Sequence, residues 1–571
     1  MTNAYRGGQL LVACLEKMGI ERCFGVPGES YLEVLDALAD SAIEFVNCRH
    51  ESAASFAASA SGKLTGQPGL CFVTRGPGAT NASIGVHDAM QNSSPMILFV
   101  GQIATSRTDR EAFQELDYRR FFSPLAKWVT QIDKVERIPE TLSRAFATAL
   151  SGRPGPVVIA LPEDMLAQET QAAPVGLPSL GRAAADPARL AAALDKLLAA
   201  DHPLIIAGGS GWNAAGQDHL QEFVETHHIP VLGGHRRQDV LDNFSPAYVG
   251  DTSVGLLPHT ADLIRRADVI WAMNIRFGEV TTADWQLHPV PKMDSFLIHS
   301  HAGPEELNKI YQADMAFNAD PNLLAEQMAG QMAEQMAGQA DGLADGLAKP
   351  HAKRLDWLAA ARADYDAASV PPAQDSPVDM SFVMGWLQDN LDPDAILTNG
   401  AGNFALWPSK YFRFSRGQRL LGPQSGAMGY GVPAALAASL HYPGRQVICF
   451  AGDGDMQMSL AELASIRQSG ARVLILILNN ASYGTIRMHQ ETYFPARKSA
   501  TDLINPDFAA VARACGLFGE QVARTEDFPA AFGRLQASDT GGVLELAIAT
   551  EAIAPLKTLS QLGKNGKTGK A

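Results

Sequence analysis

The feature that most constrains the fold is a pair of buried strand patterns, each ending in a short polar cluster. Residues 445–451 (RQVICFA) form an apolar run followed by Gly-Asp-Gly at 452–454, and residues 472–478 (RVLILIL) form a second run followed by Asn-Asn at 479–480. Between them, apolar residues recur at helical spacing over residues 460–466. This pattern predicts a strand-helix-strand unit. Parallel strands joined by a right-handed crossover end at the same edge of the sheet, where open α/β sheets bind ligands.

The two polar clusters predict a magnesium-diphosphate site at that edge. Mg²⁺ takes about six oxygen ligands and keeps phosphate oxygens and water among them. Asp453 and Asn480 supply a carboxylate and an amide oxygen that can share one ion. Gly452 and Gly454 let the backbone approach a diphosphate, and a helix N-terminus after them favours negative charge. The alternative is an ordinary crossover in which Asp453 only caps the helix; the presence of both clusters, each after a strand, disfavours it.

The motif of GDG followed after 24 residues by NN resembles the thiamine-diphosphate motif of the acetolactate synthase-like superfamily. The resemblance implies that thiamine diphosphate and Mg²⁺ are bound here. It also implies three metal ligands, namely Asp453, Asn480 and the backbone carbonyl of Ser482. The resemblance extends over about residues 4–555, with the motifs in the order that the family has.

A second motif lies near the N-terminus. The segment at 48–51 (CRHE) follows a short apolar strand pattern at 43–46 and precedes an Ala/Ser-rich helix pattern. The glutamate in this segment, Glu51, could have a purely structural role, because a negative charge is favourable at the positive N-terminal end of a helix. The resemblance implies a catalytic one. The equivalent glutamate contacts N1′ of the aminopyrimidine ring and promotes the 4′-imino tautomer, which removes the thiazolium C2 proton. A carboxyl group in an apolar cleft suits such proton sharing.

Three further segments resemble family motifs that surround the cofactor. Residues 72–81 (FVTRGPGATN) resemble the strand and glycine turn beside the pyrimidine, and residues 400–404 (GAGNF) resemble the second diphosphate-contacting turn. Residues 425–431 (SGAMGYG) place Met428 where the family has the hydrophobe that props the cofactor in its bent shape; taken alone, it would be read as core filler. The resemblance implies these cofactor-binding residues: Glu51, Pro77, Asn81, Gly402, Asn403, Gly426, Met428, Asp453, Gly454, Asp455, Asn480, Ser482, Tyr483, Gly484 and Thr485.

The reaction is less constrained, because the chain departs from each subfamily. Residues 112–117 (AFQELD) resemble the AFQE segment of acetolactate synthases, whose Phe and Gln face cofactor and substrate, so Gln114 is a candidate catalytic residue. The tryptophan that those enzymes use for the second 2-oxo acid falls at His489, and their active-site lysine falls at Glu163. His489, on the predicted helix that leaves the metal site, either faces substrate or is structural.

Glu29 is the last candidate catalytic residue. Residues 26–29 (VPGE) place it where pyruvate decarboxylases carry a catalytic aspartate in a PGD turn. It either relays protons during the reaction or caps the helix that follows. The paired histidines of those decarboxylases are not found after the first glycine turn, and the histidine of benzoylformate decarboxylases falls at Ser93. The chain therefore fits no single subfamily.

Flavin binding is a further open question. Biosynthetic acetolactate synthases hold FAD in the middle domain without using it for redox chemistry. Residues 276–279 (RFGE) partly resemble the ARFDDR strand end of those enzymes but lack its paired aspartates. Residues 298–301 (IHSH) stand where an acidic pair is usual. Whether FAD binds in the middle domain stays an open question, and these residues do not support it.

Length and strand patterns predict an α/β protein of three doubly wound parallel-sheet domains. A chain of 571 residues implies about three domains. We place a pyrimidine-binding domain at 1–170, a middle domain at 188–348, a diphosphate-binding domain at 375–555 and a flexible tail at 556–571.

A near-duplication marks the seam between the last two domains. Residues 325–332 (AEQMAGQM) are followed by 333–340 (AEQMAGQA), and two Asp-Gly-Leu-Ala copies occupy 341–348. The repeat is either a methionine stripe for a partner or an expansion that lengthens a surface helix and linker. We favour the second interpretation.

Composition limits the partners and the location. The net charge of −15 disfavours nucleic acids and anionic membrane surfaces. The six cysteines show no paired metal spacing, and we expect them to be reduced core residues. With no apolar run of membrane-spanning length and no signal-peptide pattern, we expect a cytoplasmic protein.

The resemblance implies an enzyme that decarboxylates a 2-oxo acid, with pyruvate as the expected donor, and joins the resulting enamine to a second carbonyl. It also implies an active site between subunits, where Glu51 of one chain faces Asp453 of its neighbour, in a homodimer or homotetramer. The alternatives are a simple 2-oxo acid decarboxylase, a flavin-dependent 2-oxo acid oxidase and a non-catalytic cofactor-binding protein. The presence of Glu51, Asp453 and Asn480 together argues against the last.

Overall fold

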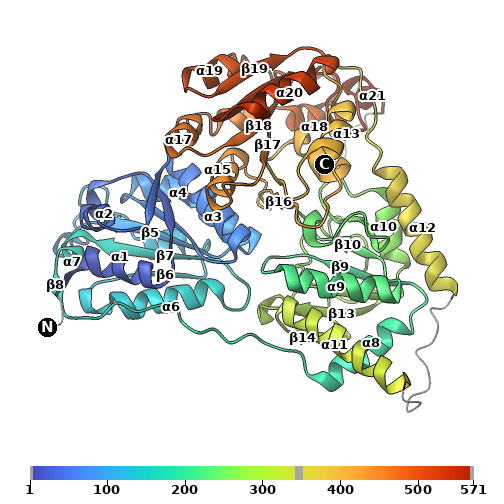
Figure 1. Ribbon diagram of the computed structural model, residues 1–571, viewed down its shortest axis with the longest axis horizontal. Coiled ribbons are helices and arrows are strands. Elements are labelled where there is room, and N and C mark those ends of the chain that lie inside the picture. Colours follow the sequence, from blue (N-terminus) through green and yellow to red (C-terminus); the bar gives the residue numbers. More distant parts are fainter. Residues whose placement is uncertain (1–3, 341–351, 566–571) are drawn as a thin grey trace.

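The chain folds into three α/β units, each built on a six-stranded parallel sheet. The computed structural model describes residues 4–340 and 352–565. The strand orders are β3-β2-β4-β5-β7-β6, β11-β10-β9-β12-β13-β14 and β16-β15-β17-β18-β20-β19. Figure 1 shows the first unit in blue and cyan, the middle unit in green and the third in orange and red, arranged as a triangle. The predicted fold class is confirmed.

The first unit has apolar strands that are buried on both faces, as a parallel sheet covered by helices requires. Its sheet contains β2 (Arg22–Gly25), β3 (Glu44–Asn47), β4 (Gly69–Val73), β5 (Met96–Gln102), β6 (Trp128–Gln131) and β7 (Pro156–Pro162). Its helices are α1 (Gly7–Lys17), α2 (Leu32–Ala39), α3 (Glu51–Thr65), α4 (Pro77–Asn92), α5 (Tyr118–Phe122), α6 (Ile138–Leu150) and α7 (Glu163–Leu166). A short antiparallel pair, β1 (Tyr5–Arg6) and β8 (Glu169–Thr170), joins its two ends.

The middle unit includes a helix that the sequence patterns did not assign. Its strands are β9 (Pro203–Ala207), β10 (Val231–Gly233), β11 (Tyr248–Asp251), β12 (Val269–Met273), β13 (Phe296–His301) and β14 (Met315–Asn318). Its helices are α8 (Pro187–Leu198), α9 (Ala214–His227), α10 (Pro258–Arg266), α11 (Pro321–Ala340) and α12 (Ala352–Ala368). Trp357 and Leu358 of α12 are buried in the same hydrophobic cluster as Leu232 and Val249 of the middle sheet. This helix, which follows residues 341–351, therefore packs on the middle unit.

The repeat lies in α11, and its first copy contributes to the core. Ala325 and Met328 are buried in the main hydrophobic cluster of the middle unit. The first copy thus contributes Ala325 and Met328 to the core, while Glu326 and Gly330 are exposed. The side chains of 332–340 and the two Asp-Gly-Leu-Ala copies at 341–348 lie outside the described residues.

The third unit carries the predicted strand-helix-strand pattern. Its strands are β15 (Ile396–Asn399), β16 (Arg419–Leu421), β17 (Val447–Gly452), β18 (Val473–Asn479), β19 (Phe518–Val522) and β20 (Gly541–Ala547). Its helices are α13 (Met380–Asn390), α14 (Leu406–Tyr411), α15 (Gly431–His441), α16 (Asp453–Gln457), α17 (Glu462–Ser469), α18 (Gly484–Tyr493), α19 (Phe508–Ala514), α20 (Phe528–Ala537) and α21 (Leu559–Asn565). The last helix packs against α18, within the predicted tail at 556–571, whose flexibility stays a prediction; residues 566–571 lie outside the described part.

The strand order reverses between β2 and β4 in the first sheet, between β9 and β12 in the middle sheet, and between β15 and β17 in the third sheet. Ligands of open α/β sheets bind outside the carboxyl ends of the strands at such a point. In the described part of the chain, no helix is long and apolar enough to cross a bilayer. Five of the six cysteines are buried, and all six are free.

The first and third units share a continuous hydrophobic core. Helix α3 packs against α15, and the rings of Phe56 and Tyr430 meet edge to face with centroids 5.5 Å apart (Figure 1). Beside this core, the buried carboxylate of Glu462 accepts the backbone N–H groups of Arg49 (3.0 Å) and His50 (3.1 Å). Burial raises the pKa of Glu462. These bonds fix the turn that precedes Glu51.

A buried lysine lies where the three units meet. The ammonium of Lys63, on α3, donates to Asn92 Oδ1 at 3.4 Å and to the backbone carbonyls of Arg236 (3.4 Å) and Gly422 (3.5 Å). Burial, with repulsion from Arg237, lowers the pKa of Lys63 to about 7. The junction thus holds a lysine that is partly neutral at ordinary pH.

We expect Lys63 to make stability depend on pH between about 7 and 10. Its folded pKa lies below the model-compound value of 10.5, so the folded protein binds fewer protons in this window and stability rises with pH. Lys63→Met should flatten that rise, by on the order of a few kcal/mol across the window. Urea unfolding at several pH values measures the slope, with the exposed Lys134→Met as control. Equal slopes in Lys63→Met and the unchanged protein would contradict the prediction.

Candidate active site

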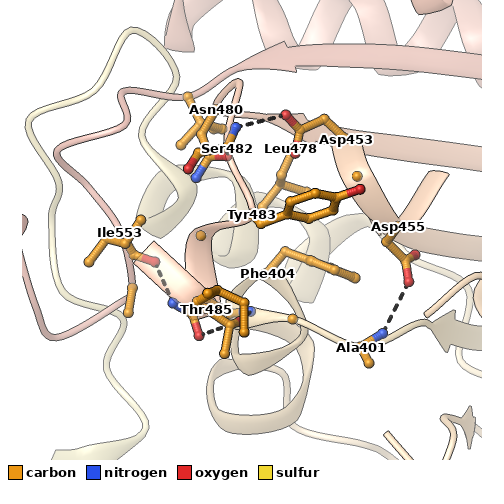
Figure 2. A pocket seen from close by; sticks show the side chains of 18 of the residues that line it. Ala401, Phe404, Asp453, Asp455, Leu478, Asn480, Ser482, Tyr483, Thr485 and Ile553 are labelled. Carbon is orange, nitrogen blue, oxygen red and sulfur yellow. Dashed lines mark hydrogen bonds between the residues drawn. The ribbon is translucent and has the colours of Figure 1, made fainter. Parts of the chain in front are cut away.

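The two polar clusters lie at neighbouring strand ends, as their sequence pattern predicts. Strands β17 and β18 run parallel, with Gly452 paired to Leu478, so Asp453 and Asn480 emerge at the same edge. Figure 2 shows Asp453, Asn480 and Ser482 around one hollow, which is a cavity of about 280 Å³. We call it the third-sheet cavity.

Twelve of the predicted cofactor-binding residues line the third-sheet cavity. They come from the loop after β15, the segment before α15, the turn after β17 and the turn from β18 into α18. They are Gly402, Asn403, Gly426, Met428, Asp453, Gly454, Asp455, Asn480, Ser482, Tyr483, Gly484 and Thr485. Residues that the motifs did not indicate complete the wall, notably Trp407, Ile548 and Ala552.

A residue that the sequence patterns missed holds the Asp453 turn. The side-chain amide of Asn505 donates to Asp453 Oδ2 at 2.7 Å and to Asn479 Oδ1 at 3.0 Å. The same Oδ2 accepts the N–H of Ser482 at 3.2 Å. Burial raises the pKa of Asp453. Asn505 is a lone asparagine in an irregular segment, so no spacing in the sequence identifies it.

Asp455 joins the two glycine turns of the cavity. Its carboxylate is buried and accepts the N–H groups of Gly429 (2.9 Å) and Ala401 (3.2 Å). Burial raises the pKa of Asp455 to about 7. Figure 2 shows Asp455 directed at the Ala401 turn, away from the Asp453 side.

Thr485 and Asn403 connect the opposite wall. Thr485 Oγ1 accepts the backbone N–H of Asn403 at 3.0 Å and donates to its Oδ1 at 2.9 Å, while Asn403 Nδ2 donates to the carbonyl of Ile553 at 2.9 Å. Ile553 follows β20, the neighbour of β18 on its far side, so a third strand end contributes to the cavity.

The donor set fits Mg²⁺ and a diphosphate. A carboxylate (Asp453), an amide oxygen (Asn480) and a backbone carbonyl (Ser482) are hard oxygen ligands of the kind that Mg²⁺ prefers. Helix α18 begins at Gly484 on the cavity wall, so its first N–H groups face the space. A Cβ built on Gly454 would lie 2.6 Å from the Tyr483 ring, which gives this motif glycine a steric reason as well.

The remaining cofactor-binding candidates lie in the first unit. Glu51 begins α3, and its Oε2 accepts the side-chain N–H of Asn81 at 2.9 Å. The glycine turn runs beside it, since a Cβ on Gly78 would lie 3.5 Å from Glu51 Oε1. Pro77 and Asn81, on α4, are exposed. The described residues that line the third-sheet cavity include none from the first unit, so one chain holds two separate groups of candidates.

Glu29 and Gln114 meet at an arginine. Arg75 Nη2 donates to Glu29 Oε1 at 2.6 Å, its Nε to Gln114 Oε1 at 3.2 Å, and its Nη1 to Glu163 Oε2 at 2.9 Å. We call these four residues the Arg75 cluster. Glu29 opens the short 3₁₀ helix η1 (Glu29–Tyr31), which Gly28 caps without a side-chain hydrogen bond. Arg75 lies in the glycine-turn motif at 72–81. Its partners are 39 to 88 residues away in the sequence, so the sequence does not assign it a role.

His489 does not reach the third-sheet cavity. It lies on α18, where its ring stacks on Tyr493 with centroids 6.1 Å apart, and it is not among the residues that line the cavity. This placement favours the structural alternative, and a substrate contact of His489 stays a prediction.

A second cavity, also of about 280 Å³, lies at the switch point of the middle sheet. Arg153, Arg276 and His301 are among the residues that line it. Burial lowers the pKa of His299 and of His301 to about 4, so neutral imidazoles stand where an acidic pair is usual. These residues add no support for FAD.

Each of the three units matches a known family of domains. The chain matches the thiamine pyrophosphate enzyme N-terminal TPP binding domain over residues 5–121, the central domain over 190–328 and the C-terminal TPP binding domain over 400–546. The chain belongs to the thiamine pyrophosphate enzyme family.

Within that family it is homologous to acetolactate synthase large subunits. It is 30% identical over 539 residues to the acetolactate synthase large subunit of Parasynechococcus marenigrum, an alignment that covers 91% of this chain and 84% of the relative. It is 28% identical over 551 residues to the acetolactate synthase isozyme 2 large subunit of Escherichia coli, which covers 95% of each chain.

We expect Asn505→Ala to weaken magnesium-dependent binding of thiamine diphosphate. The substitution removes the amide that holds Asp453, and loss of such an outer partner costs about 10- to 100-fold in metal affinity. Titration of the apoprotein with Mg²⁺ at fixed thiamine diphosphate, followed by intrinsic fluorescence, measures the shift. Asn390→Ala is the matched control, because that exposed amide contacts only the Trp386 carbonyl of its own helix. Equal midpoints for the two variants would refute the role given to Asn505.

Proposed function

We propose that this protein decarboxylates a 2-oxo acid, with pyruvate as the donor, and transfers the remaining acyl unit to a second carbonyl compound. The observation that carries the proposal is the third-sheet cavity, in which Asp453, Asn480 and Ser482 face the Gly402-Asn403 turn. The similarity to acetolactate synthase large subunits supports the reaction class. Thiamine diphosphate and Mg²⁺ are the cofactors in this proposal.

Bound in the third-sheet cavity, thiamine diphosphate would supply an electron sink when the bond between the carbonyl carbon and the carboxylate carbon of the 2-oxo acid breaks. Asp453, Asn480 and the carbonyl of Ser482 would hold the Mg²⁺ ion. The N–H groups at the start of α18 would bind the diphosphate, and Met428 would support the cofactor from the opposite wall.

Glu51 is the proposed proton-sharing residue. Its carboxylate would exchange a proton with N1′ of the aminopyrimidine. Asn81 holds this carboxylate by a 2.9 Å hydrogen bond, and Glu462 fixes the turn before it, so both the direction and the position of the side chain are set. A positioned acid-base group of this kind contributes about 10²- to 10⁴-fold to rate.

A second copy of the chain would complete the active site. In one chain, Glu51 and the third-sheet cavity lie on different units and share no cavity-lining residues among those described. The face of α4 that carries Pro77 and Asn81 also exposes Ile84, whose exposed fraction is 39%. We propose that this face packs on the third unit of a partner, so that a homodimer is the minimum active unit and a homotetramer is the expected assembly.

A simple 2-oxo acid decarboxylase is the second candidate. Glu29 supports it, because this acidic side chain stands at the carboxyl edge of the first sheet, where a proton donor would convert the acyl unit to an aldehyde. The products distinguish the two candidates.

We expect pyruvate to be converted to CO₂ and acetolactate when Mg²⁺ and thiamine diphosphate are present. The assay is CO₂ release from a panel of 2-oxo acids with identification of products by mass spectrometry. Glu51→Gln should lower kcat by at least about 100-fold, because it removes the proton-sharing carboxyl, while cofactor binding persists. Acetaldehyde as the sole product would favour the second candidate. No CO₂ from any 2-oxo acid would refute both.

We expect Glu51→Gln and Asp453→Asn to complement each other when co-expressed. Random pairing makes half of the dimers mixed, and each mixed dimer has one intact site of two, so about a quarter of the unchanged activity should return. Each variant expressed alone is the control and should be inactive. Activity no higher than that of the single variants would place both residues in a site formed by one chain.

A further inference from the structure

Met428 lies in an irregular segment of the third unit. We call residues 422–430, which connect β16 to α15, the Met428 segment. Gly426 and Met428 of this segment line the third-sheet cavity. Gly426 and Gly429, on either side of Met428, have positive φ values of 69° and 81°, which glycine adopts at little cost. Because two conformationally permissive residues flank Met428, its position depends on contacts that the segment makes with the rest of the chain.

A carboxyl group of the first unit holds one end of the Met428 segment. Asp88, on α4, is fully buried, and its Oδ1 accepts the hydroxyl of Ser425 at 2.7 Å. Its Oδ2 accepts the hydroxyl of Ser59 at 3.0 Å and the side-chain amide of Asn92 at 2.8 Å. Burial raises the pKa of Asp88, and the hydrogen bonds from these partners act in the opposite direction. Ser59 and Asn92 belong to α3 and α4, so the Ser425 bond is the one that crosses to the third unit.

The other end of the segment is held within the third unit. The backbone N–H of Gly429 donates to Asp455 Oδ1 at 2.9 Å. Met428 therefore lies between two anchored residues, Ser425 before it and Gly429 after it. Since the first anchor is a residue of α4, the position of Met428 depends on the first unit of the same chain.

The bond between Ser425 and Asp88 is favourable for two reasons. Its length of 2.7 Å is the usual optimum for a hydrogen bond between two oxygens. A buried carboxyl oxygen that loses its partner also bears the full cost of its desolvation, so the arrangement that keeps Ser425 on Asp88 is preferred. The backbone that leads from Ser425 to Met428 is thereby fixed at its start.

We propose that Asp88 is a positioning residue for the cofactor: through Ser425 it fixes Met428 against thiamine diphosphate bound in the third-sheet cavity, and so supports the bent shape of that cofactor. The inference rests on the proposed function and deepens it, because it gives the first unit a role in the cofactor site of its own chain, in addition to supplying Glu51 to a partner.

Hydrogen exchange in the cofactor-free protein tests the anchor. Ser425→Ala removes the hydroxyl, so the amides of residues 424–430 should exchange faster. Ser59→Ala is the matched control, because it removes another hydroxyl from the same carboxyl group and leaves the Ser425 bond in place. Exchange of residues 424–430 should be unchanged in the control. Equal exchange in the two variants would overturn the proposal.

The second readout compares turnover with cofactor affinity. In Ser425→Ala, kcat for CO₂ release should fall about tenfold or more, since a misplacement of about 1 Å away from the reacting atoms can cost ~10²-fold. The half-saturating concentration of thiamine diphosphate should change less than kcat, because Asp453 and Asn480 still hold the diphosphate end through Mg²⁺. Ser59→Ala should keep both values. A kcat in Ser425→Ala equal to that of Ser59→Ala would contradict the positioning role.

Variants of Asp88 show whether it acts through Ser425. Asp88→Ala should reproduce the loss of kcat seen in Ser425→Ala, and the double variant should lose no more than Asp88→Ala alone, because both changes remove the same contact. Asp88→Asn keeps an acceptor oxygen for Ser425 and should retain most of kcat. Losses that add in the double variant would refute action through Ser425. If Asp88→Ala does not fold, the Ser425 and Ser59 variants still decide the matter.

These readouts separate the inference from the proposed function. If the unchanged protein releases no CO₂ from any 2-oxo acid, the proposed function fails. Exchange and the circular dichroism that thiamine diphosphate acquires on binding then still decide the role of Ser425, because the dichroism should change in Ser425→Ala and not in Ser59→Ala. If the unchanged protein is active and Ser425→Ala alters neither exchange nor kcat, the inference alone is refuted.

Discussion

Parallel strand pairing is the constraint on which the rest of this structure depends. A parallel sheet is covered by helices on both faces, so its strands are near-continuous apolar runs and most polar side chains appear where the strands end. Because all the strands of a sheet end at one edge, the chemistry of each unit collects there. Asp453 and Asn480 meet for this reason, and Glu29, Arg75 and Glu51 line the edge of the first sheet for the same reason.

The second determinant is the contact between the first and third units. Helices α3 and α15 bury a shared apolar core, and a buried carboxylate is tolerated beside it only because it is hydrogen-bonded. Glu462 satisfies this condition by accepting the N–H groups of Arg49 and His50. The cost of burying that charge is thereby offset by bonds that fix the start of α3. The backbone just before Glu51 is therefore held by the third unit of its own chain, while Asn81 of the first unit holds its carboxylate.

The sequence predicted what depends on strand ends and local spacing. The fold class, the neighbouring ends of β17 and β18 and the start of α3 at Glu51 all follow from apolar runs and short motifs. Contacts between distant loops could not be predicted this way. Asn505 contacts Asp453 from an irregular segment, and Arg75 contacts residues of three other segments. No periodic pattern in the sequence indicates either set of contacts. The helix α21 was not predicted because its seven residues show no clear apolar periodicity, and its packing partner α18 lies far away in the sequence.

The acidic groups at the edges of the first and third sheets have different partners. In the third-sheet cavity, Asp453 and Asp455 are carboxyl groups whose pKa is raised by burial, and the hydrogen bonds that they accept offset only part of that effect. The oxygen donors beside Asp453 are of the kind that a hard divalent ion prefers. At the first-sheet edge the chain supplies the cation itself, because Arg75 pairs with Glu29 and Glu163. The carboxylates of the third-sheet cavity thus have only neutral hydrogen-bond donors as partners among the described residues, whereas Glu29 and Glu163 at the first-sheet edge are paired with a guanidinium.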